Sequence, residues 1–359
     1  MISEKLVLAP FVRFGYFNSK LYIGFGSIMN CIESADFADL CILMAKIWKL
    51  PHTTEEIEVI FSKSFAQDLI NKGIALFVNN YVISESIMSV LSEREDRYNR
   101  SHIFYSLSKS NPLQVTKFLQ NSHVIILGCG GIGNIVATLL ATNGVGTITL
   151  VDDDRIELSN LTRQLMFTEI DVGKNKTMVL KSSIEKRNSS IIVNTVNLRI
   201  ASYQDLLLLP RNINLIILSA DEPSEIIKWV NLYSIAFKVP YINVGYVEDI
   251  AVWGPFVIPG ITACWECQEL VAAESLASED RNKVTIIKEI NKQYMTPSFG
   301  AVNLLAASAA TLDILKYLGR FGNIQSFNKR LGIWTDELKI ETQNCGRNPC
   351  CHVCGKAEA

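Results

Sequence analysis

The stretch VIILGCGGIG, from Val124 to Gly133, decides the fold of this chain. An apolar run of strand length passes directly into a glycine-rich turn, and a helical pattern continues from there as far as Gly144. Glycine lets the backbone turn sharply and approach a phosphate closely, and the N-terminus of the following helix favours negative charge. The sequence therefore predicts a nucleotide-binding loop that contains Gly128, Gly130, Gly131 and Gly133.

Strand-like and helical segments alternate around this loop. Strand-like apolar runs fall at residues 123–128, 146–152, 191–198, 213–221 and 240–246, and helical patterns fall at 133–144, 174–188 and 222–238. Pro223 is expected in the first turn of the last of these helices. Such alternation predicts an α/β fold with a Rossmann-like, doubly wound and largely parallel sheet.

Composition divides the chain into three stretches. Residues 1–85 are expected to form a winged-helix-like α+β module, and residues 86–120 a polar connecting segment or helix. Residues 121–359 would form the nucleotide-binding domain. A chain of 359 residues is long enough for these two domains.

The N-terminal module has a recognisable order of elements. Aromatic and β-branched runs flank Asn18, which predicts a β-hairpin. Helical patterns follow at 35–50 and 64–73, and Thr53 with Glu56 forms a capping-box start. Because the module has no basic face, we expect it to bind a peptide rather than DNA. A plain dimerisation or packing domain is the alternative.

Charge and hydropathy limit the possible partners. The formal net charge of −2 gives no reason to expect nucleic acid. The apolar stretch from Phe299 to Leu318 contains Asn303 and Asp313, so a buried helix explains it better than a membrane span. The N-terminus lacks the basic-then-apolar order of a signal peptide. We expect a cytoplasmic protein without a membrane or nucleic-acid partner.

A carboxylate follows the second strand of the nucleotide-binding domain. Asp152 lies 19 residues after Gly133, where a carboxylate can bind ribose hydroxyls. We expect Asp152 and the nearby Asp154 to contact the nucleotide. An NAD-dependent oxidoreductase meets this pattern equally well, so the pattern predicts a nucleotide without saying which one.

Residues beyond Asp152 favour ATP. Asn160 and Arg163 follow on the next segment, and Lys176 comes soon after. A dinucleotide needs no such set, because the glycine loop holds its pyrophosphate. A triphosphate needs several cations, since charge builds on the pyrophosphate as it leaves. We therefore expect ATP to be cleaved at this site.

Asp221 directly follows the apolar strand-like stretch LIILSA at 215–220. This position is the carboxyl end of a strand, where doubly wound sheets place their ligand sites. Mg²⁺ prefers one or two carboxylates together with phosphate oxygens. Asp221 is therefore the expected magnesium ligand.

Two C-x-x-C pairs stand near the C-terminal end of the chain. CWEC supplies Cys264 and Cys267, and CHVC supplies Cys351 and Cys354. Two such pairs in a reducing compartment predict a closed, tetrahedral zinc site that attaches the C-terminal tail to the domain. Cys350 is a possible substitute ligand, and a redox role for the pairs is the weaker alternative.

Together these motifs resemble the E1-like adenylating family. That family includes the enzymes that activate the sulfur carriers of molybdopterin and thiamine biosynthesis, and the ubiquitin-activating enzymes. The resemblance runs from about Arg97 to Gly355 and rests on RYNR, GCGGIG, VDDDRIELSNLTRQ, DVGKNK, SADE, CWEC and NPCCHVCG, in that order. It implies an ATP-dependent adenylyltransferase with an E1-like adenylation domain.

The resemblance also implies a role for each matching residue. Gly131 and Asp152 would hold the adenosine side of ATP, and Asp221 would bind Mg²⁺. The phosphates would be held by Asn160, Arg163 and Lys176. Arg100, the second arginine of RYNR, would reach into the active site of the other subunit, which implies a homodimer. The four cysteines match the zinc ligands of the family.

The chain departs from the family pattern in two places. Glu222 stands where the family often has asparagine, so the contact made by that neighbour of Asp221 is not carried over. The segment at 268–300 contains no cysteine, whereas members that form a thioester generally place one there. We therefore expect adenylation without a transfer thiol.

The N-terminal module resembles the winged-helix clamps used in ribosomal peptide modification. An E1-like domain with such a clamp implies a short peptide substrate, Met-Arg-Thr-Gly-Asn-Ala-Asn, activated at its C-terminal asparagine. The terminal carboxylate would attack ATP to give an acyl-adenylate and pyrophosphate, and the asparagine amide would then close a succinimide. The imide nitrogen would attack a second ATP, and ring opening would leave AMP joined to the peptide by a P–N bond.

Three alternatives remain. The first is adenylation of the C-terminal glycine of a ubiquitin-like sulfur carrier, against which the additional N-terminal module and the missing transfer cysteine count. The second is a nucleotide-binding scaffold that has lost catalysis. The third is an NAD-dependent oxidoreductase, which would need a catalytic acid or base beside a nicotinamide.

Overall fold

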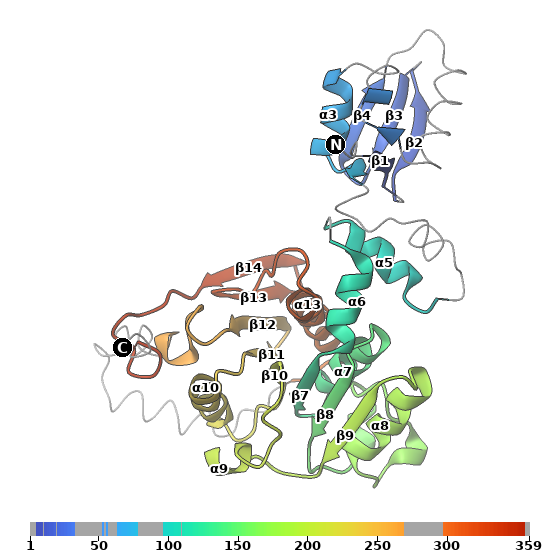
Figure 1. The fold of residues 1–359 in the computed structure, drawn as a ribbon. Helices are drawn as coiled ribbons and strands as arrows, with labels where there is room; N and C mark the ends of the chain where they lie inside the picture. Colours follow the sequence, from blue (N-terminus) through green and yellow to red (C-terminus); the bar gives the residue numbers. More distant parts are fainter. Residues whose placement is uncertain are drawn as a thin grey trace. The chain divides into compact units, whose positions relative to one another are not determined.

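The structure is a computed structural model (Figure 1). It describes residues 5–9, 11–18, 20–32, 52–53, 55–56, 63–77, 96–108, 110–268 and 297–355. The chain divides into two compact units, Met1–Lys117 and Phe118–Ala359. The predicted boundaries after residues 85 and 120 stay predictions, because residues 78–95 lie outside the described part.

The first unit contains two small antiparallel sheets. In one, β1 (Lys5–Leu8) lies between β5 (His52–Thr53) and β6 (Ala75–Phe77). The other is the meander of β2 (Arg13–Phe17), β3 (Lys20–Phe25) and β4 (Ile28–Ile32). The predicted hairpin is the β2–β3 pair, which turns at Asn18 with a left-handed φ of 48°.

The predicted start and end signals of the helices in this unit are confirmed where the structure describes them. The backbone N–H of Thr53 donates to Glu56 Oε2 at 2.8 Å, and the N–H of Glu56 donates to Thr53 Oγ1 at 3.2 Å, which is the expected capping box. Helix α3 (Lys63–Asn71) ends just before Gly73, whose φ is 70°. The helix predicted at 35–50 lies outside the described residues.

Two further helices occupy the predicted connecting segment. They are α5 (Asn99–Ser106) and α6 (Pro112–Gln120). The buried ring of His102 on α5 lies 2.9 Å from Thr116 Oγ1 on α6 and 3.2 Å from an Asp96 carboxylate oxygen. Burial lowers the pKa of His102, and the Asp96 charge opposes that shift.

The second unit is built on one eight-stranded sheet. Its strand order is β14-β13-β12-β11-β10-β7-β8-β9. The five strands at one end run parallel, as predicted: β7 (His123–Leu127), β8 (Thr147–Val151), β9 (Ile192–Val196), β10 (Leu215–Leu218) and β11 (Tyr241–Val247). The chain builds outward from β7 through β8 to β9, and then returns to the other side of β7 with β10. Strand order therefore reverses between β7 and β10.

Three antiparallel strands extend the sheet beyond β11, and the sequence patterns do not predict them. They are β12 (Ile250–Val257), β13 (Lys329–Trp334) and β14 (Lys339–Asn344). β12 follows β11 through a tight hairpin in which Glu248 has a φ of 49°. β13 comes more than 70 residues later in the chain, and only the tertiary fold brings it to the sheet.

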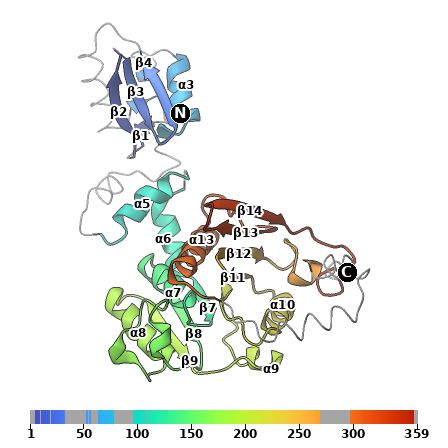
Figure 2. The same ribbon diagram turned by 180° about the vertical axis from the view of Figure 1, so that it is seen from behind.

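Helices cover both faces of the sheet (Figures 1 and 2). One face carries α7 (Gly133–Thr142), α8 (Lys176–Arg187) and α13 (Gly300–Gly319), and the other carries α9 (Tyr203–Leu206) and α10 (Ile226–Phe237). Pro223 was expected inside the first turn of α10, and this is wrong. The helix begins at Ile226, whose N–H donates to the Pro223 carbonyl at 2.9 Å, so Pro223 precedes it.

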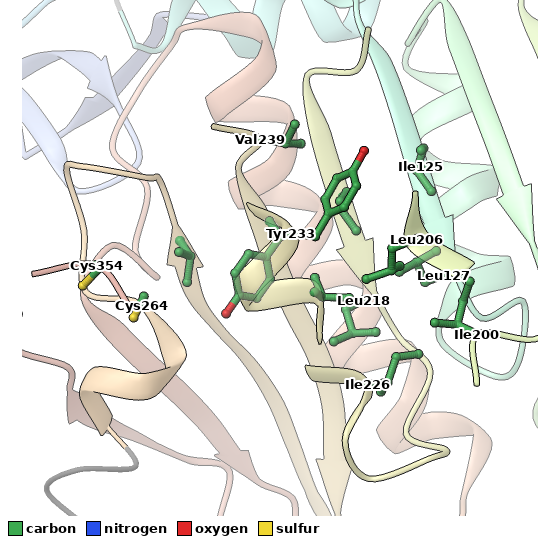
Figure 3. Packing of buried hydrophobic residues seen from close by; sticks show 14 of the residues in the cluster. Ile125, Leu127, Ile200, Leu206, Leu218, Ile226, Tyr233, Val239, Cys264 and Cys354 are labelled. Carbon is green, nitrogen blue, oxygen red and sulfur yellow. The ribbon is translucent and has the colours of Figure 1, made fainter. Parts of the chain in front are cut away.

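A hydrophobic core fills the space between the sheet and α9 with α10 (Figure 3). Ile125, Leu127 and Leu218 project from the parallel strands and meet Tyr233 of α10, all with exposures of 1% or less. The same cluster continues to the buried cysteine pairs. One apolar core therefore positions both the strand ends and the cysteine cluster.

Helix α13 is the helix that the apolar stretch at Phe299–Leu318 predicts. By length and composition it is the one helix among the described residues that could cross a membrane. It packs on β11, β12 and α7, as a core helix does. Asp313, 2% exposed, accepts hydrogen bonds from Gln325 N (2.9 Å), Ser326 N (3.0 Å), Ser326 Oγ (2.7 Å) and Trp253 Nε1 (3.2 Å).

We predict that Asp313→Ala destabilises the second unit by about 3 kcal/mol, because removal of the carboxylate leaves buried N–H donors without acceptors. Urea unfolding followed by tryptophan fluorescence measures the shift. Ser308→Ala, at an exposed position of the same helix, is the control. Its free energy of unfolding should stay within about 0.5 kcal/mol of the wild-type value. Equal unfolding midpoints for the two variants would contradict this role of Asp313.

Candidate active site

A cavity of about 360 Å³ opens at the carboxyl ends of β7, β8 and β10, where the strand order reverses. This is the place at which doubly wound sheets bind ligands. Most of the residues predicted from the sequence line it: Gly128, Gly130, Gly131, Asp152, Asp154, Arg163, Lys176 and Asp221. Residues separated by more than 90 positions in the chain thus surround one space.

The glycines of the loop are required by its geometry. Gly128 has a φ of 92°, and a Cβ there would lie 2.8 Å from Ala220 N. Gly133 opens α7 and does not line the cavity. A Cβ at Gly133 would collide with the Gly128 carbonyl. Only glycine at position 133 therefore allows the loop to fold back against the start of α7. The N-terminus of α7 therefore lies directly beneath the cavity, where it favours a phosphate.

Asp152 is held in place by the backbone. One of its carboxylate oxygens accepts the Cys129 N–H at 2.7 Å, and the other accepts the Asp154 N–H at 2.8 Å. Burial raises the pKa of Asp152, while the Cys129 N–H and the Lys176 charge oppose that shift. Each oxygen keeps a free lone pair. The carboxylate can therefore accept hydrogen bonds from two ribose hydroxyls and still keep those from the Cys129 and Asp154 N–H groups.

Cys129 lies inside the glycine loop and is fully buried. Burial raises its pKa well above the ordinary value, and the Asp152 charge acts in the same direction. The thiol therefore stays protonated and unreactive near neutral pH. Its place in the loop is explained by its small size.

Cations line the side of the cavity next to Asp152. Lys176 is 6% exposed, and its Nζ lies 2.6 Å from an Asp154 carboxylate oxygen. Arg163 donates from Nη1 to the Ser159 carbonyl at 3.0 Å. Arg199, which the sequence patterns do not single out, also lines the cavity and is exposed. Arg199 follows the carboxyl end of β9. Because doubly wound sheets place their ligand sites at such strand ends, the sequence could have identified Arg199 by the same argument as Asp221.

Asn160 does not line the cavity. Its Oδ1 accepts the Glu157 N–H at 3.1 Å, and so caps the short turn η1 (Leu158–Asn160). The side chain is 7% exposed. A phosphate contact by Asn160 stays a prediction, and in this structure the residue shapes the segment that carries Arg163.

Two buried amides complete the lining, one from the segment that follows Asp152 and one from α13. Gln164 and Asn303 are 3% and 2% exposed. Gln164 Oε1 and Asn303 Oδ1 have no hydrogen-bond partner within the described part of the chain. Such acceptors suit the hydroxyl and amino donors of a nucleoside. Asn303 comes from α13, and the sequence carries no signal that links it to the glycine loop.

Asp221 lies at the rim of the cavity, beyond the end of β10. Its carboxylate and that of Glu222 are exposed, as a ligand of hydrated Mg²⁺ must be. Asp152, Asp153 and Asp154 also place carboxylate oxygens within 4.8 Å of one another. The carboxylates present therefore fit a magnesium ion bound together with a triphosphate.

The four predicted cysteines meet in one buried cluster. Figure 3 shows two of them, Cys264 and Cys354, beside the core. The Sγ atoms of Cys264 and Cys267 lie 3.9 Å apart, those of Cys264 and Cys351 3.7 Å, and those of Cys267 and Cys354 3.4 Å. A tetrahedral zinc with bonds of about 2.3 Å requires sulfur–sulfur distances of about 3.8 Å. Cys351 belongs to the buried cluster, whereas Cys350 is exposed.

Hydrogen bonds fix the cysteine cluster to the rest of the unit. Asn231 Oδ1 of α10 accepts Tyr241 OH at 3.1 Å and the Trp265 N–H at 3.0 Å. Arg347 in the C-terminal tail donates to the Gly260 and Cys354 carbonyls, each at 3.1 Å. These bonds tie the C-terminal tail and the first cysteine pair to α10, to the start of β11 and to the loop after β12.

Arg100 belongs to the other compact unit. It lies on α5 and is exposed. Its predicted action in the active site of a second subunit stays a prediction.

The chain matches the ThiF family over residues 98–353. Among curated proteins it is 26% identical to the molybdopterin-synthase adenylyltransferase of Escherichia coli over 270 residues, which are 75% of this chain and all of that enzyme. It is 34% identical to the NEDD8-activating enzyme E1 catalytic subunit of Saccharomyces cerevisiae over 156 residues. That match covers 40% of this chain and 50% of the yeast protein.

Solved structures of E. coli MccB resemble nearly the whole chain. The MccB structure with ATP is 37% identical, covers 98% of this chain and 100% of its own, and has a TM-score of 0.83. The complex of MccB with AMPCPP and MccA is 38% identical, with the same coverage and TM-score. The family motifs surround one nucleotide-sized cavity at the reversal of strand order. This chain is therefore an ATP-dependent adenylyltransferase, and it belongs to the ThiF family.

Proposed function

We propose that this enzyme adenylates the C-terminal asparagine of a short ribosomal peptide and converts it into a peptide–AMP phosphoramidate, with two ATP consumed. This is the chemistry of a microcin C7 type of antibiotic biosynthesis. Adenylation of a ubiquitin-like sulfur carrier is the alternative.

The extent of the two matches carries the proposal. The molybdopterin-synthase adenylyltransferase is matched over its whole length, yet it accounts for only 75% of this chain. E. coli MccB accounts for 98%. The additional residues, which a sulfur-carrier enzyme lacks, include the N-terminal module. E. coli MccB has been crystallised with ATP, with AMPCPP and MccA, and with succinimide.

The described cavity can perform the first step by placement. The peptide carboxylate is already a nucleophile, so no general base is needed. Its oxygen would bond to the α-phosphorus of ATP as the bond to pyrophosphate breaks. Lys176 and Arg163 would stabilise the charge on the leaving pyrophosphate, and Mg²⁺ on Asp221 would supply further positive charge.

We further propose structural zinc on the four cysteines and a homodimer in which Arg100 completes the active site of the partner subunit. A cytoplasmic location without nucleic-acid or membrane partners is part of this proposal. The closed arrangement of four buried sulfurs supports the structural role of the metal, because it leaves no coordination position for a substrate.

The first prediction concerns the product. Incubation of the protein with Mg²⁺, ATP and the synthetic peptide Met-Arg-Thr-Gly-Asn-Ala-Asn should add one AMP unit through an acid-labile P–N bond. Mass spectrometry before and after mild acid treatment measures this. An unchanged peptide, with activity instead on a carrier that ends in Gly-Gly, would support the alternative substrate and reject this one.

The second prediction concerns the ATP site. Arg163→Ala and Asp221→Ala should fold normally and lower the rate of pyrophosphate release about 100-fold or more, because each removes charge stabilisation of the transition state. Circular dichroism checks the fold. Arg187→Ala and Asp336→Ala remove exposed charges that do not line the cavity and should keep the wild-type rate. Near-wild-type rates in Arg163→Ala or Asp221→Ala would refute the site assignment.

The third prediction concerns the cysteine cluster. Cys354→Ala should lose bound zinc and unfold at lower temperature, because three thiolates no longer close a tetrahedral site. Cys350→Ala is the matched control, since Cys350 is exposed and should leave the zinc content unchanged. Metal analysis of both purified variants decides the outcome. Full zinc occupancy in Cys354→Ala would remove this residue from the ligand set.

A further inference from the structure

A second cavity of about 240 Å³ adjoins the nucleotide cavity on the side of β11, β12 and β13. The two cavities share six lining residues: Ile132, Ser219, Ala220, Asp221, Ile226 and Tyr246. The loop glycines Gly128, Gly130 and Gly131, together with Asp152, line only the first. A group bound in the second cavity can therefore reach the phosphates past Asp221 while the nucleoside remains beside β7 and β8.

The polar lining of this second cavity is unusual. Arg330 of β13 is half-buried, and its guanidinium forms no ion pair or hydrogen bond within the described ranges. Asn243 of β11 is also half-buried, and its amide likewise has no partner there. The indole Nε1 of Trp265 is a buried donor with no acceptor among the described residues. Buried and half-buried groups of this kind normally find partners.

Charge indicates what the second cavity binds. Its lining contains one cation, Arg330, and one anion, Asp221, and we have assigned Asp221 to Mg²⁺. Arginine pairs with carboxylates through two parallel N–H groups. The primary amide of Asn243 offers both a donor and an acceptor, as does the amide of a substrate asparagine. The remaining walls, such as Val252 and Ile227, are apolar and exclude water.

We propose that this second cavity binds the C-terminal residue of the peptide substrate. Arg330 pairs with the terminal carboxylate, and Asn243 hydrogen-bonds to the side-chain amide of the terminal asparagine. This inference rests on the proposed function and goes beyond it, because it names the residues that select the acyl substrate. It also gives the antiparallel half of the sheet a role in substrate recognition.

The placement suits the reaction. A carboxylate that approaches a triphosphate meets repulsion, and a cation on the acyl side of Asp221 offsets it before Mg²⁺ and Lys176 act on the leaving group. An asparagine held by its side-chain amide also stays close to its own activated carbonyl, which ring closure to a succinimide requires. A terminal glycine would leave both Asn243 and the volume of the cavity unused.

The experiment compares Arg330→Gln with Lys329→Gln, which removes an exposed charge from the preceding position of β13. Steady-state pyrophosphate release gives KM for ATP and for the synthetic heptapeptide. Arg330→Gln should raise the peptide KM about 10-fold or more, as expected for loss of a hydrogen bond to a charged group, and change the ATP KM less than about twofold. Lys329→Gln should change neither.

A second measurement separates direct contact from a loss of structure. Calorimetric titration without ATP compares the heptapeptide acid with the same peptide carrying a C-terminal carboxamide. Wild type should bind the acid about 10-fold more tightly than the carboxamide, and Arg330→Gln should bind both equally. Arg330→Lys should restore part of the preference, because it restores the charge without the planar fork.

Asn243→Ala tests the selection of the side chain. The ratio of kcat/KM for peptides that end in asparagine and in alanine should fall about 10-fold or more, because Asn243 no longer distinguishes the amide. If the wild type does not adenylate the heptapeptide, the proposed function fails. If the wild type is active and Arg330→Gln retains its peptide KM and its preference for the acid, this inference fails alone.

Discussion

The reversal of strand order between β7 and β10 is the constraint on which the active site depends. Two parallel strands whose following loops must diverge leave a crevice at their carboxyl ends. The glycine loop enters this crevice from one side and Asp221 from the other. Gly128 and Gly133 are glycines because the loop turns back against Ala220 and its own carbonyl, where no Cβ fits. Lys176 and Arg163 line the same crevice and the N-terminus of α7 borders it, an arrangement that suits a triphosphate.

In our proposal, the antiparallel half of the sheet recognises the acyl substrate. β12 and β13 extend the sheet past β11 and carry Arg330 to a cavity that borders Asp221. Asn231 on α10 hydrogen-bonds to Tyr241 of β11 and to the backbone between the two cysteines of the first pair. Arg347 hydrogen-bonds to the carbonyl of Cys354 in the second pair. The cysteine cluster thus stabilises the wall of the second cavity, at a distance from the nucleotide that it never contacts.

Membership of the ThiF family accounts for the adenylation chemistry of this chain, and the family model matches residues 98–353. Before that range, the described residues form two small antiparallel sheets and helix α3. A protein carrier brings its own folded surface to an adenylating enzyme, whereas a short peptide has none. In the function that we propose, the N-terminal module would offset this lack by providing binding energy remote from the reacting carboxylate.

Sequence alone determined the parallel strands, the glycine loop, the ribose carboxylate, the cations that follow it and the cysteine pairs. These features are local: strand and helix periodicity, a turn that requires glycine, and C-x-x-C spacing are each set within a few residues. Only the tertiary structure decided that Gln164 and Asn303 line the nucleotide cavity with amide oxygens that have no partner in the described part of the chain, and that Asn160 caps a turn instead. It also decided that β13 brings Arg330 to a cavity that Asp221 also lines. Those outcomes depend on contacts between residues far apart in the chain, and such contacts leave no periodic trace in the sequence.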